Sequence, residues 1–163
     1  MKKIIFLDID GVLNVYCQGR DVFGCTFHKH FEDNLRLIIE QTGAKIVISS
    51  TWRYSGLKVL KEMWISRGLA GEVIDITPDM IKFVDNEDIY ESVERGEEIH
   101  KWLDDHSDIE SYVIIDDDDD MLESQKDNFV LTANNSDHED CVDIGYGLTR
   151  ICAEKAIEIL NKK

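Results

Sequence analysis

The chain has 163 residues, of which 43% are hydrophobic and 32% charged, a balance typical of a soluble globular protein. Its formal net charge of −16 argues against tight binding to nucleic-acid backbones, which depends on clustered Lys and Arg side chains. No apolar run approaches the roughly 20 residues of a membrane span, so we expect no membrane association and a cytoplasmic location.

Short apolar runs and segments with helical spacing alternate along the chain. A continuous apolar run that ends at polar residues predicts a buried parallel strand. Apolar residues three and four apart predict a helix, and Gly43 and Gly68 mark the ends of the first two helices. The expected strands cover residues 3–7, 45–48, 72–76, 112–115 and 128–131, and the expected helices cover residues 31–41, 57–67, 96–105 and 148–160.

This alternation predicts an α/β fold, a doubly wound, parallel, five-stranded Rossmann-like sheet with helices on both faces. We expect a single domain over residues 1–163, with a short flap insertion at about 11–30. Neither this insertion nor residues 77–95 is long enough for a large cap domain. Residues 79–95 are polar and receive no assignment, and the acidic residues 134–143 are expected to form a loop near the mouth of the site.

The chain has four cysteines, Cys17, Cys25, Cys141 and Cys152. Because they form no Cys-x-x-Cys pair and the chain is not cysteine-dense, we expect reduced thiols. The proximity of His28 and His30 to the first two cysteines leaves a zinc site as the less favoured alternative to an ordinary polar loop.

Acidic residues follow two of the predicted strands. Asp8 and Asp10 end the first strand, and they share one face because residues two apart in an extended segment point the same way. Asp116 and Asp117 end the fourth strand, although the acidic run 116–120 taken alone is more typical of a solvated loop. In doubly wound sheets ligands bind at the carboxyl ends of the strands, where these carboxylates would meet and favour Mg²⁺.

Two serines, a tryptophan and an arginine follow the second strand. Ser49 and Ser50 lie at the same predicted sheet edge, where a helix N-cap or a turn is the alternative interpretation. We interpret Trp52 as a packing residue, with stacking on a base or ring as the alternative. Arg53 completes this polar stretch.

Together these motifs resemble the haloacid dehalogenase (HAD) superfamily over nearly the whole chain. Residues 6–12 are similar to its first motif, residues 46–49 to its second and residues 114–117 to its fourth. More narrowly, residues 49–53, 95–99 and 147–149 are similar to the small HAD domains of Swiss Army Knife RNA-repair proteins.

The resemblance implies roles for individual residues. Asp8 would be the nucleophile, and Asp10 the acid that protonates the leaving oxygen and then the base that activates water. Ser49, or Ser50 in the other register, would bind the transferring phosphoryl group. Mg²⁺ would be held by Asp8, by Asp10 through its backbone carbonyl, and by the acidic fourth motif, Asp116 and Asp117.

One motif departs from the family pattern. The third motif is usually a Lys, and here the best-placed cation is Arg95, ahead of Lys82 and Lys101. Arg95 and Arg53 are therefore our candidates for phosphate binding, since a guanidinium can hold phosphate through two parallel hydrogen bonds.

The resulting prediction is a Mg²⁺-dependent phosphomonoester hydrolase that forms a phospho-aspartate. Asp10 favours a phosphatase, because dehalogenases of this superfamily lack an acid there and P-type ATPases carry a Lys. A terminal phosphate on a nucleotide or nucleic acid is a candidate substrate, as are sugar phosphates and phosphoproteins, and no stable partner is inferred. The alternatives are a catalytically silent metal- or phosphate-binding module, and a receiver-type domain, which needs a Lys after the fifth strand where residues 132–134 have none.

Overall fold

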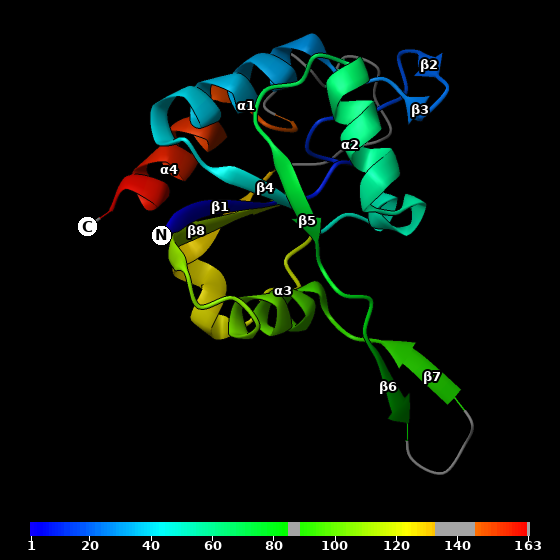
Figure 1. The fold of residues 1–163 in the computed structure, drawn as a ribbon, viewed down its shortest axis with the longest axis vertical. Coiled ribbons are helices and arrows are strands. Elements are labelled where there is room, and N and C mark those ends of the chain that lie inside the picture. The colour runs from blue at the N-terminus through cyan, green and yellow to red at the C-terminus, as the bar shows by residue number, and fades with distance from the viewer. Residues whose placement is uncertain (85–88, 133–145, 163) are drawn as a thin grey trace.

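A five-stranded parallel sheet forms the centre of the computed structural model, which describes residues 1–84, 89–132 and 146–162 (Figure 1). For residues 82–84 and 89–92 only the backbone is described. The sheet order is β5-β4-β1-β8-β9, and every neighbouring pair is parallel. The strands are β1 (Lys2–Leu7), β4 (Lys45–Ile48), β5 (Val73–Ile76), β8 (Ile109–Asp116) and β9 (Phe129–Leu131). The predicted fold class is confirmed.

The strand order separates this fold from that of a receiver domain. Numbered along the chain, the five strands lie in the order 3-2-1-4-5, whereas receiver domains have the order 2-1-3-4-5. The receiver alternative is therefore wrong. The chain reverses its direction of winding between β1 and β8, and the carboxyl ends of these two strands form the crevice in which such sheets bind ligands.

Helices cover both faces of the sheet. Helices α1 (Lys29–Thr42), α2 (Leu57–Ser66) and α4 (Arg150–Asn161) lie on one face, and α3 (Arg95–Asp104) lies on the other (Figure 1). Two short 3₁₀ helices, η1 (Thr51–Ser55) and η2 (Glu123–Asn128), follow β4 and precede β9. Within the described ranges, no helix combines the length and hydropathy needed to cross a membrane.

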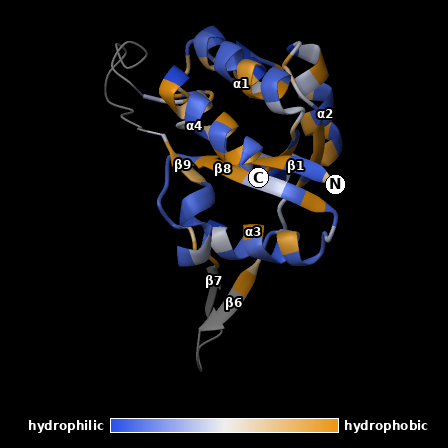
Figure 2. Ribbon diagram, turned by 90° about the vertical axis from the view of Figure 1, so that its left-hand side faces the viewer, coloured by the Kyte–Doolittle hydropathy of each residue, from blue (hydrophilic) through white to orange (hydrophobic). Residues whose placement is uncertain are grey.

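The apolar side chains of β1 alternate between two cores, as the period of a strand requires. Ile5 and Leu7 pack into the larger cluster beneath α1, α2 and α4, while Ile4 and Phe6 pack against α3. Phe6 meets Trp102 of α3 edge to face, with ring centroids 5.3 Å apart. The central strands consist mostly of hydrophobic residues, whereas the helices mix hydrophobic and hydrophilic ones (Figure 2). A strand buried on both faces explains the continuous apolar run in its sequence.

Two antiparallel hairpins lie outside the central sheet. The flap insertion contains β2 (Arg20–Asp21) paired with β3 (Gly24–Cys25). Residues 79–95, which received no assignment, contain β6 (Ile81–Val84) paired with β7 (Ile89–Ser92), and this hairpin extends away from the sheet (Figure 1). Strands of two to four residues are too short to show a clear alternation in the sequence. The acidic segment 134–143 lies outside the described residues.

The flap carries a disulfide between Cys17 and Cys25, whose Cα atoms are 5.3 Å apart. Our expectation of reduced thiols is wrong for this pair, because the β2–β3 hairpin turns the chain back and brings the two residues within bonding range. Cys152 is a free thiol, and Cys141 lies outside the described residues. The disulfide also removes the sulfur ligands of the zinc alternative.

Candidate active site

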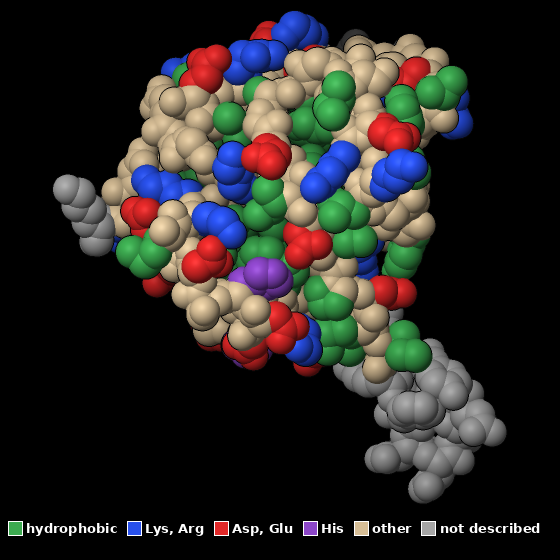
Figure 3. Space-filling model, viewed as in Figure 1, with side chains coloured by type: hydrophobic (Ala, Val, Ile, Leu, Met, Phe, Trp, Pro, Cys, Tyr) green, Lys and Arg blue, Asp and Glu red, His purple; other side chains and the backbone are tan. Residues whose placement is uncertain are grey.

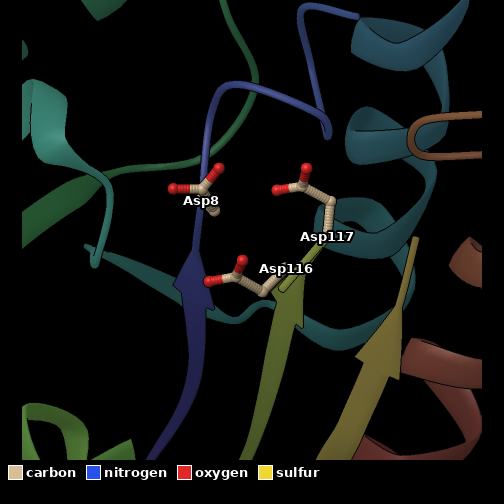
Figure 4. Close-up of side chains that lie close together, drawn as sticks. All are labelled: Asp8, Asp116 and Asp117. Carbon is tan, nitrogen blue, oxygen red and sulfur yellow. The ribbon is translucent and has the colours of Figure 1, made fainter. Parts of the chain in front are cut away.

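Three carboxylates meet at the carboxyl ends of β1 and β8. Asp8 follows β1, Asp116 is the last residue of β8 and Asp117 follows it, and the three side chains point toward one another (Figure 4). One oxygen of each lies within 4.8 Å of the others. The register brings them level, since Leu7 pairs with Ile115. The predicted meeting of the two acidic strand ends is observed, and we call Asp8, Asp116 and Asp117 the carboxylate cluster.

Arg95 reaches the carboxylate cluster from the first turn of α3. Its Nη1 atom donates to Asp8 Oδ1 at 2.6 Å and to the Ser49 carbonyl at 2.9 Å, and lies 3.3 Å from Asp116 Oδ2. Asp120 fixes the start of α3 by accepting from the Arg95 backbone N–H at 3.0 Å. Of the two other candidate cations, Lys101 pairs with Asp105 on the outside of α3, and the Lys82 side chain is not described.

Close packing holds the start of α3 in this position. The Gln125 side chain of η2 donates to the Gly96 carbonyl at 2.8 Å. A Cβ atom on Gly96 would lie only 2.6 Å from the Leu122 backbone nitrogen, so no larger residue fits without displacing η2. The lack of a side chain at Gly96 therefore lets α3 approach closely enough for Arg95 to enter the site.

Burial governs the acidity of the carboxylate cluster. Burial raises the pKa of Asp8 to about 6, and the nearby charge and hydrogen bond of Arg95 limit the rise. Burial, followed by repulsion from Asp8, raises the pKa of Asp116 to about 8. The pKa of Arg95 is raised because the carboxylates of Asp116 and Asp8 outweigh its own desolvation. One arginine therefore does not fully compensate the negative charge of this cluster.

The carboxylate cluster fits a hard divalent cation. Carboxylate oxygens are the ligands that Mg²⁺ prefers, and the three acids each offer one. Asp116 Oδ2 is buried with no hydrogen-bond partner among the described residues, although it lies 3.3 Å from Arg95 Nη1, so it has room to bind a cation. Gly11 has a φ of 77°, and a side chain there would overlap the Asp117 carboxylate. The predicted Mg²⁺ ligands Asp8, Asp116 and Asp117 thus form one donor set.

The carboxylate of Asp10 lies apart from this cluster, on an exposed residue. Its Oδ2 atom accepts from the indole Nε1 of Trp52 at 2.9 Å, and its Oδ1 atom accepts from the Asn14 amide at 3.1 Å. Two donors therefore fix the direction of this carboxylate. Trp52 also packs against Phe27, with ring centroids 5.7 Å apart, so packing describes only part of its role. In the sequence, the one feature that hinted at this contact is the position of Trp52 just after the two serines.

Ser49 and Ser50 are both fully buried but differ in their contacts. A hydrogen bond from the Ser50 side chain to Asp8 helps to lower the pKa of that acid. The Ser50 hydroxyl oxygen also accepts from the backbone N–H of Trp52 at 3.4 Å. Ser49 instead meets the site through its carbonyl, and its hydroxyl has no hydrogen-bond partner among the described residues. These contacts favour Ser50 as the hydroxyl beside the nucleophile.

Arg53 is held by an acid that the sequence did not single out. Its Nη2 atom donates to both carboxylate oxygens of Glu98, at 2.9 and 2.8 Å, and its Nη1 atom donates to the Ser49 carbonyl at 3.0 Å. Glu98, only 3% exposed, also accepts from the Met80 backbone N–H at 3.2 Å. The Arg53 guanidinium therefore links η1 to α3 below the carboxylate cluster. Glu98 lies three residues after Arg95 and thus on the same side of α3, the one signal that could have found it.

Comparison with known families agrees with this geometry. A family model described as "HAD domain in Swiss Army Knife RNA repair proteins" matches residues 4–136. The chain belongs to this family. As a HAD domain it shares a scaffold of hydrolases and phosphatases, and the match spans every candidate site residue from Asp8 to Asp117. No curated protein and no solved structure matches the chain.

Proposed function

We propose that this HAD domain is a Mg²⁺-dependent phosphomonoester hydrolase that works through a phospho-aspartate on Asp8. The observation that carries the proposal is the 2.6 Å contact between Arg95 and Asp8 inside the carboxylate cluster. This contact brings a buried carboxylate, the proposed nucleophile, next to a guanidinium that can bind a phosphoryl oxygen. The other acids of the cluster can hold a cation.

In the first step, an Asp8 carboxylate oxygen attacks phosphorus and the bond from phosphorus to the ester oxygen breaks. Asp10 gives its proton to that oxygen, which leaves as an alcohol. Arg95 and the Ser50 hydroxyl donate to the phosphoryl oxygens, where negative charge accumulates. The hydrogen bonds from Trp52 and Asn14 hold the Asp10 carboxylate in one orientation.

In the second step, Asp10 takes a proton from water and the water oxygen attacks phosphorus. The bond between phosphorus and Asp8 breaks, which releases inorganic phosphate and restores the Asp8 carboxylate. The covalent intermediate divides the hydrolysis into two steps, each with a lower barrier than a single direct step. A cation held by Asp8, Asp116 and Asp117 supplies positive charge that offsets the repulsion between these acids and the phosphate.

The proposed substrate carries its phosphate on a nucleotide or a nucleic-acid end. The absence of a large cap over the described part of the chain supports a substrate bulkier than a free metabolite. The printed description of the family, which concerns RNA repair, supports the same class. The face in Figure 3 mixes acidic and basic side chains without a continuous basic surface. The net charge of −16 supports contact with a terminus rather than with a long backbone.

The test is hydrolysis of p-nitrophenyl phosphate by the wild type, Asp8→Asn and Asp10→Asn, with Mg²⁺ or with EDTA. We expect activity that disappears with EDTA and with either substitution. Asp33→Asn, an exposed carboxylate on α1 that pairs with Lys29, is the matched control and should retain full activity. A ³²P label that stays on the wild type after acid quenching and is released by hydroxylamine would identify the acyl phosphate.

Retained activity in Asp8→Asn would refute the covalent mechanism. If phosphorylated nucleotides and oligonucleotide ends also remained unhydrolysed while Mg²⁺ still bound, the domain would be a silent metal- and phosphate-binding module. The arginine in place of the usual third-motif lysine is the observation that favours this alternative.

A further inference from the structure

A hollow of about 350 Å³ lies between the disulfide-closed β2–β3 hairpin and η1. Its lining includes Asp10, Arg20, Phe23, Gly24 and Trp52, and we call it the hairpin hollow. Its volume falls in the range of small-ligand sites. Asp10 belongs both to this lining and to the proposed reaction, in which it protonates the leaving oxygen. A leaving group in contact with Asp10 would therefore occupy the hairpin hollow.

Two aromatic side chains line the hairpin hollow, and both are only partly buried. The hairpin backbone lies directly against the indole ring, since a Cβ atom on Gly24 would be 3.3 Å from Trp52 Cη2. The Trp52 ring is further fixed by its hydrogen bond to Asp10. The backbone N–H of Phe23 donates to Asp21 Oδ1 at 2.8 Å, which holds the hairpin backbone that carries this side chain. Two partly exposed rings, of which the Trp52 ring is held in place, offer a surface on which a flat ring can stack.

The lining of the hairpin hollow also includes a cation, Arg20. Arg20 is exposed, and no carboxylate of the described residues lies within ion-pair distance of it. The neighbouring Asp21 is paired with Arg67, which donates to both of its carboxylate oxygens at 2.9 Å. In a chain of net charge −16, a guanidinium that lines the same hollow as Asp10 and has no ion pair within the described ranges is suited to a second anionic group on the ligand.

We infer that the hairpin hollow is a leaving-group subsite that selects phosphomonoesters carrying both an aromatic base and a second phosphate. Phe23 and Trp52 contact the base and Arg20 contacts the second phosphate. This inference rests on the proposed function, because it assigns the hollow to the alcohol that Asp10 protonates. A nucleoside bisphosphate and the phosphorylated end of an oligonucleotide share this chemistry.

The test compares kcat/KM for four small esters that vary the two features independently. They are glycerol 2-phosphate, propanediol 1,3-bisphosphate, adenosine 5′-monophosphate and adenosine 3′,5′-bisphosphate. Phe23→Leu should lower kcat/KM about tenfold for the two adenosine esters and leave the aliphatic esters within twofold. Arg20→Gln should lower it about tenfold for the two bisphosphates alone. Tyr54→Leu and Arg36→Gln, which alter an exposed aromatic and an exposed arginine outside the hollow, are the matched controls.

Losses of equal size on all four esters, or no preference of the wild type for a base or a second phosphate, would overturn the inference. The proposed function would still stand if the aliphatic esters were hydrolysed with Mg²⁺. If no ester were hydrolysed, the proposed function would fail. Calorimetric titration with adenosine 3′,5′-bisphosphate would then test whether the hairpin hollow binds this ligand. Binding weakened by Phe23→Leu and Arg20→Gln but not by the controls would support it, and equal or absent binding would refute it. A 5′-phosphorylated oligonucleotide in the same assay distinguishes a nucleic-acid end from a free nucleotide.

Discussion

The Nη1 atom of Arg95 lies 2.6 Å from the Oδ1 atom of Asp8 and also donates to the carbonyl of Ser49. One guanidinium thus joins the candidate nucleophile to the strand that carries the second motif. Both hydrogen bonds come from this one nitrogen, and the guanidinium carries a second terminal nitrogen with N–H donors, which the single compact charge of a lysine lacks. Arg95, which enters from α3, is therefore our candidate for the third-motif cation.

Replacing Arg95 should separate catalysis from folding. We expect Arg95→Gln to lower kcat/KM for p-nitrophenyl phosphate at least a hundredfold, because a donor to the developing charge is lost. Arg95→Lys should retain part of the activity, since it keeps the charge without the fork. Circular dichroism of both variants should match the wild type. Wild-type rates in Arg95→Gln would show that the arginine only supports the fold.

The stability of the metal-free protein should decrease as the pH rises. Asp116 and Asp8 have pKa values of about 8 and about 6 in the folded protein, while an unfolded Asp has about 3.9. The folded state therefore holds protons that the unfolded state releases, and this contribution is complete below about pH 4 and is lost as the pH passes 6 and then 8. In EDTA, the urea midpoint should fall between pH 6 and pH 9. Asp116→Asn should reduce this slope, and an unchanged slope would contradict the assignment.

The buried pair of Arg53 and Glu98 should matter for stability more than for catalysis. Glu98→Leu removes the buried partner of Arg53 and leaves Asp79, 3.7 Å from Nη2 and more exposed, as its remaining ion pair, and should cost about 3–5 kcal/mol in urea unfolding. Adding Arg53→Met should recover much of this loss, because an apolar pair can replace a buried ion pair. If the folded double variant kept near wild-type kcat/KM, Arg53 would not be a phosphate contact. If kcat/KM of the double variant fell by more than its folded fraction, Arg53 would be a phosphate contact.

Trp52 should act by positioning Asp10. Trp52→Phe keeps an aromatic ring but removes the Nε1 donor, and we expect kcat to fall about tenfold with KM nearly unchanged. The pH profile of kcat should shift as well, which a purely structural defect would not cause. Trp102→Phe is the matched control, because it removes an equivalent indole bond, to Asp75, away from the carboxylate cluster. Equal effects of the two substitutions would refute the positioning role.

The disulfide should stabilise the hairpin hollow. Reduction, or Cys17→Ser, should lower the free energy of unfolding by about 2 kcal/mol and reduce the preference for adenosine esters over aliphatic ones. Cys152→Ser, which removes the free thiol on α4, should change neither property. Substrate preference that is independent of reductant would show that the hairpin keeps its position without the bond. The same comparison indicates how the protein would behave in a reducing cytoplasm, where such bonds are rare.

Several features could be read from the sequence because they depend on local chemistry. The continuous apolar runs predicted all five sheet strands, and Gly43 predicted the end of α1, where its N–H bonds to the Ile39 carbonyl. Asp8 and Asp116 were predicted to meet because parallel strands bring their carboxyl ends to one edge. The contacts of Ser50 with Asp8 and of Arg53 with Glu98 were not predictable, since each depends on the exact orientation of a side chain between two elements.

The sequence by itself determined the order along the chain of the five sheet strands and the four α-helices, the acidic strand ends and the membership of a phosphohydrolase-like family. These follow from periodicity and from residues that are neighbours along the chain. Only the tertiary structure decided that Arg95 meets Asp8, that Arg53 is held by Glu98, that Cys17 is bonded to Cys25 and that Trp52 holds Asp10. Each of these contacts joins residues on separate elements, and their distances are set by how closely the helices and the hairpin pack against the sheet.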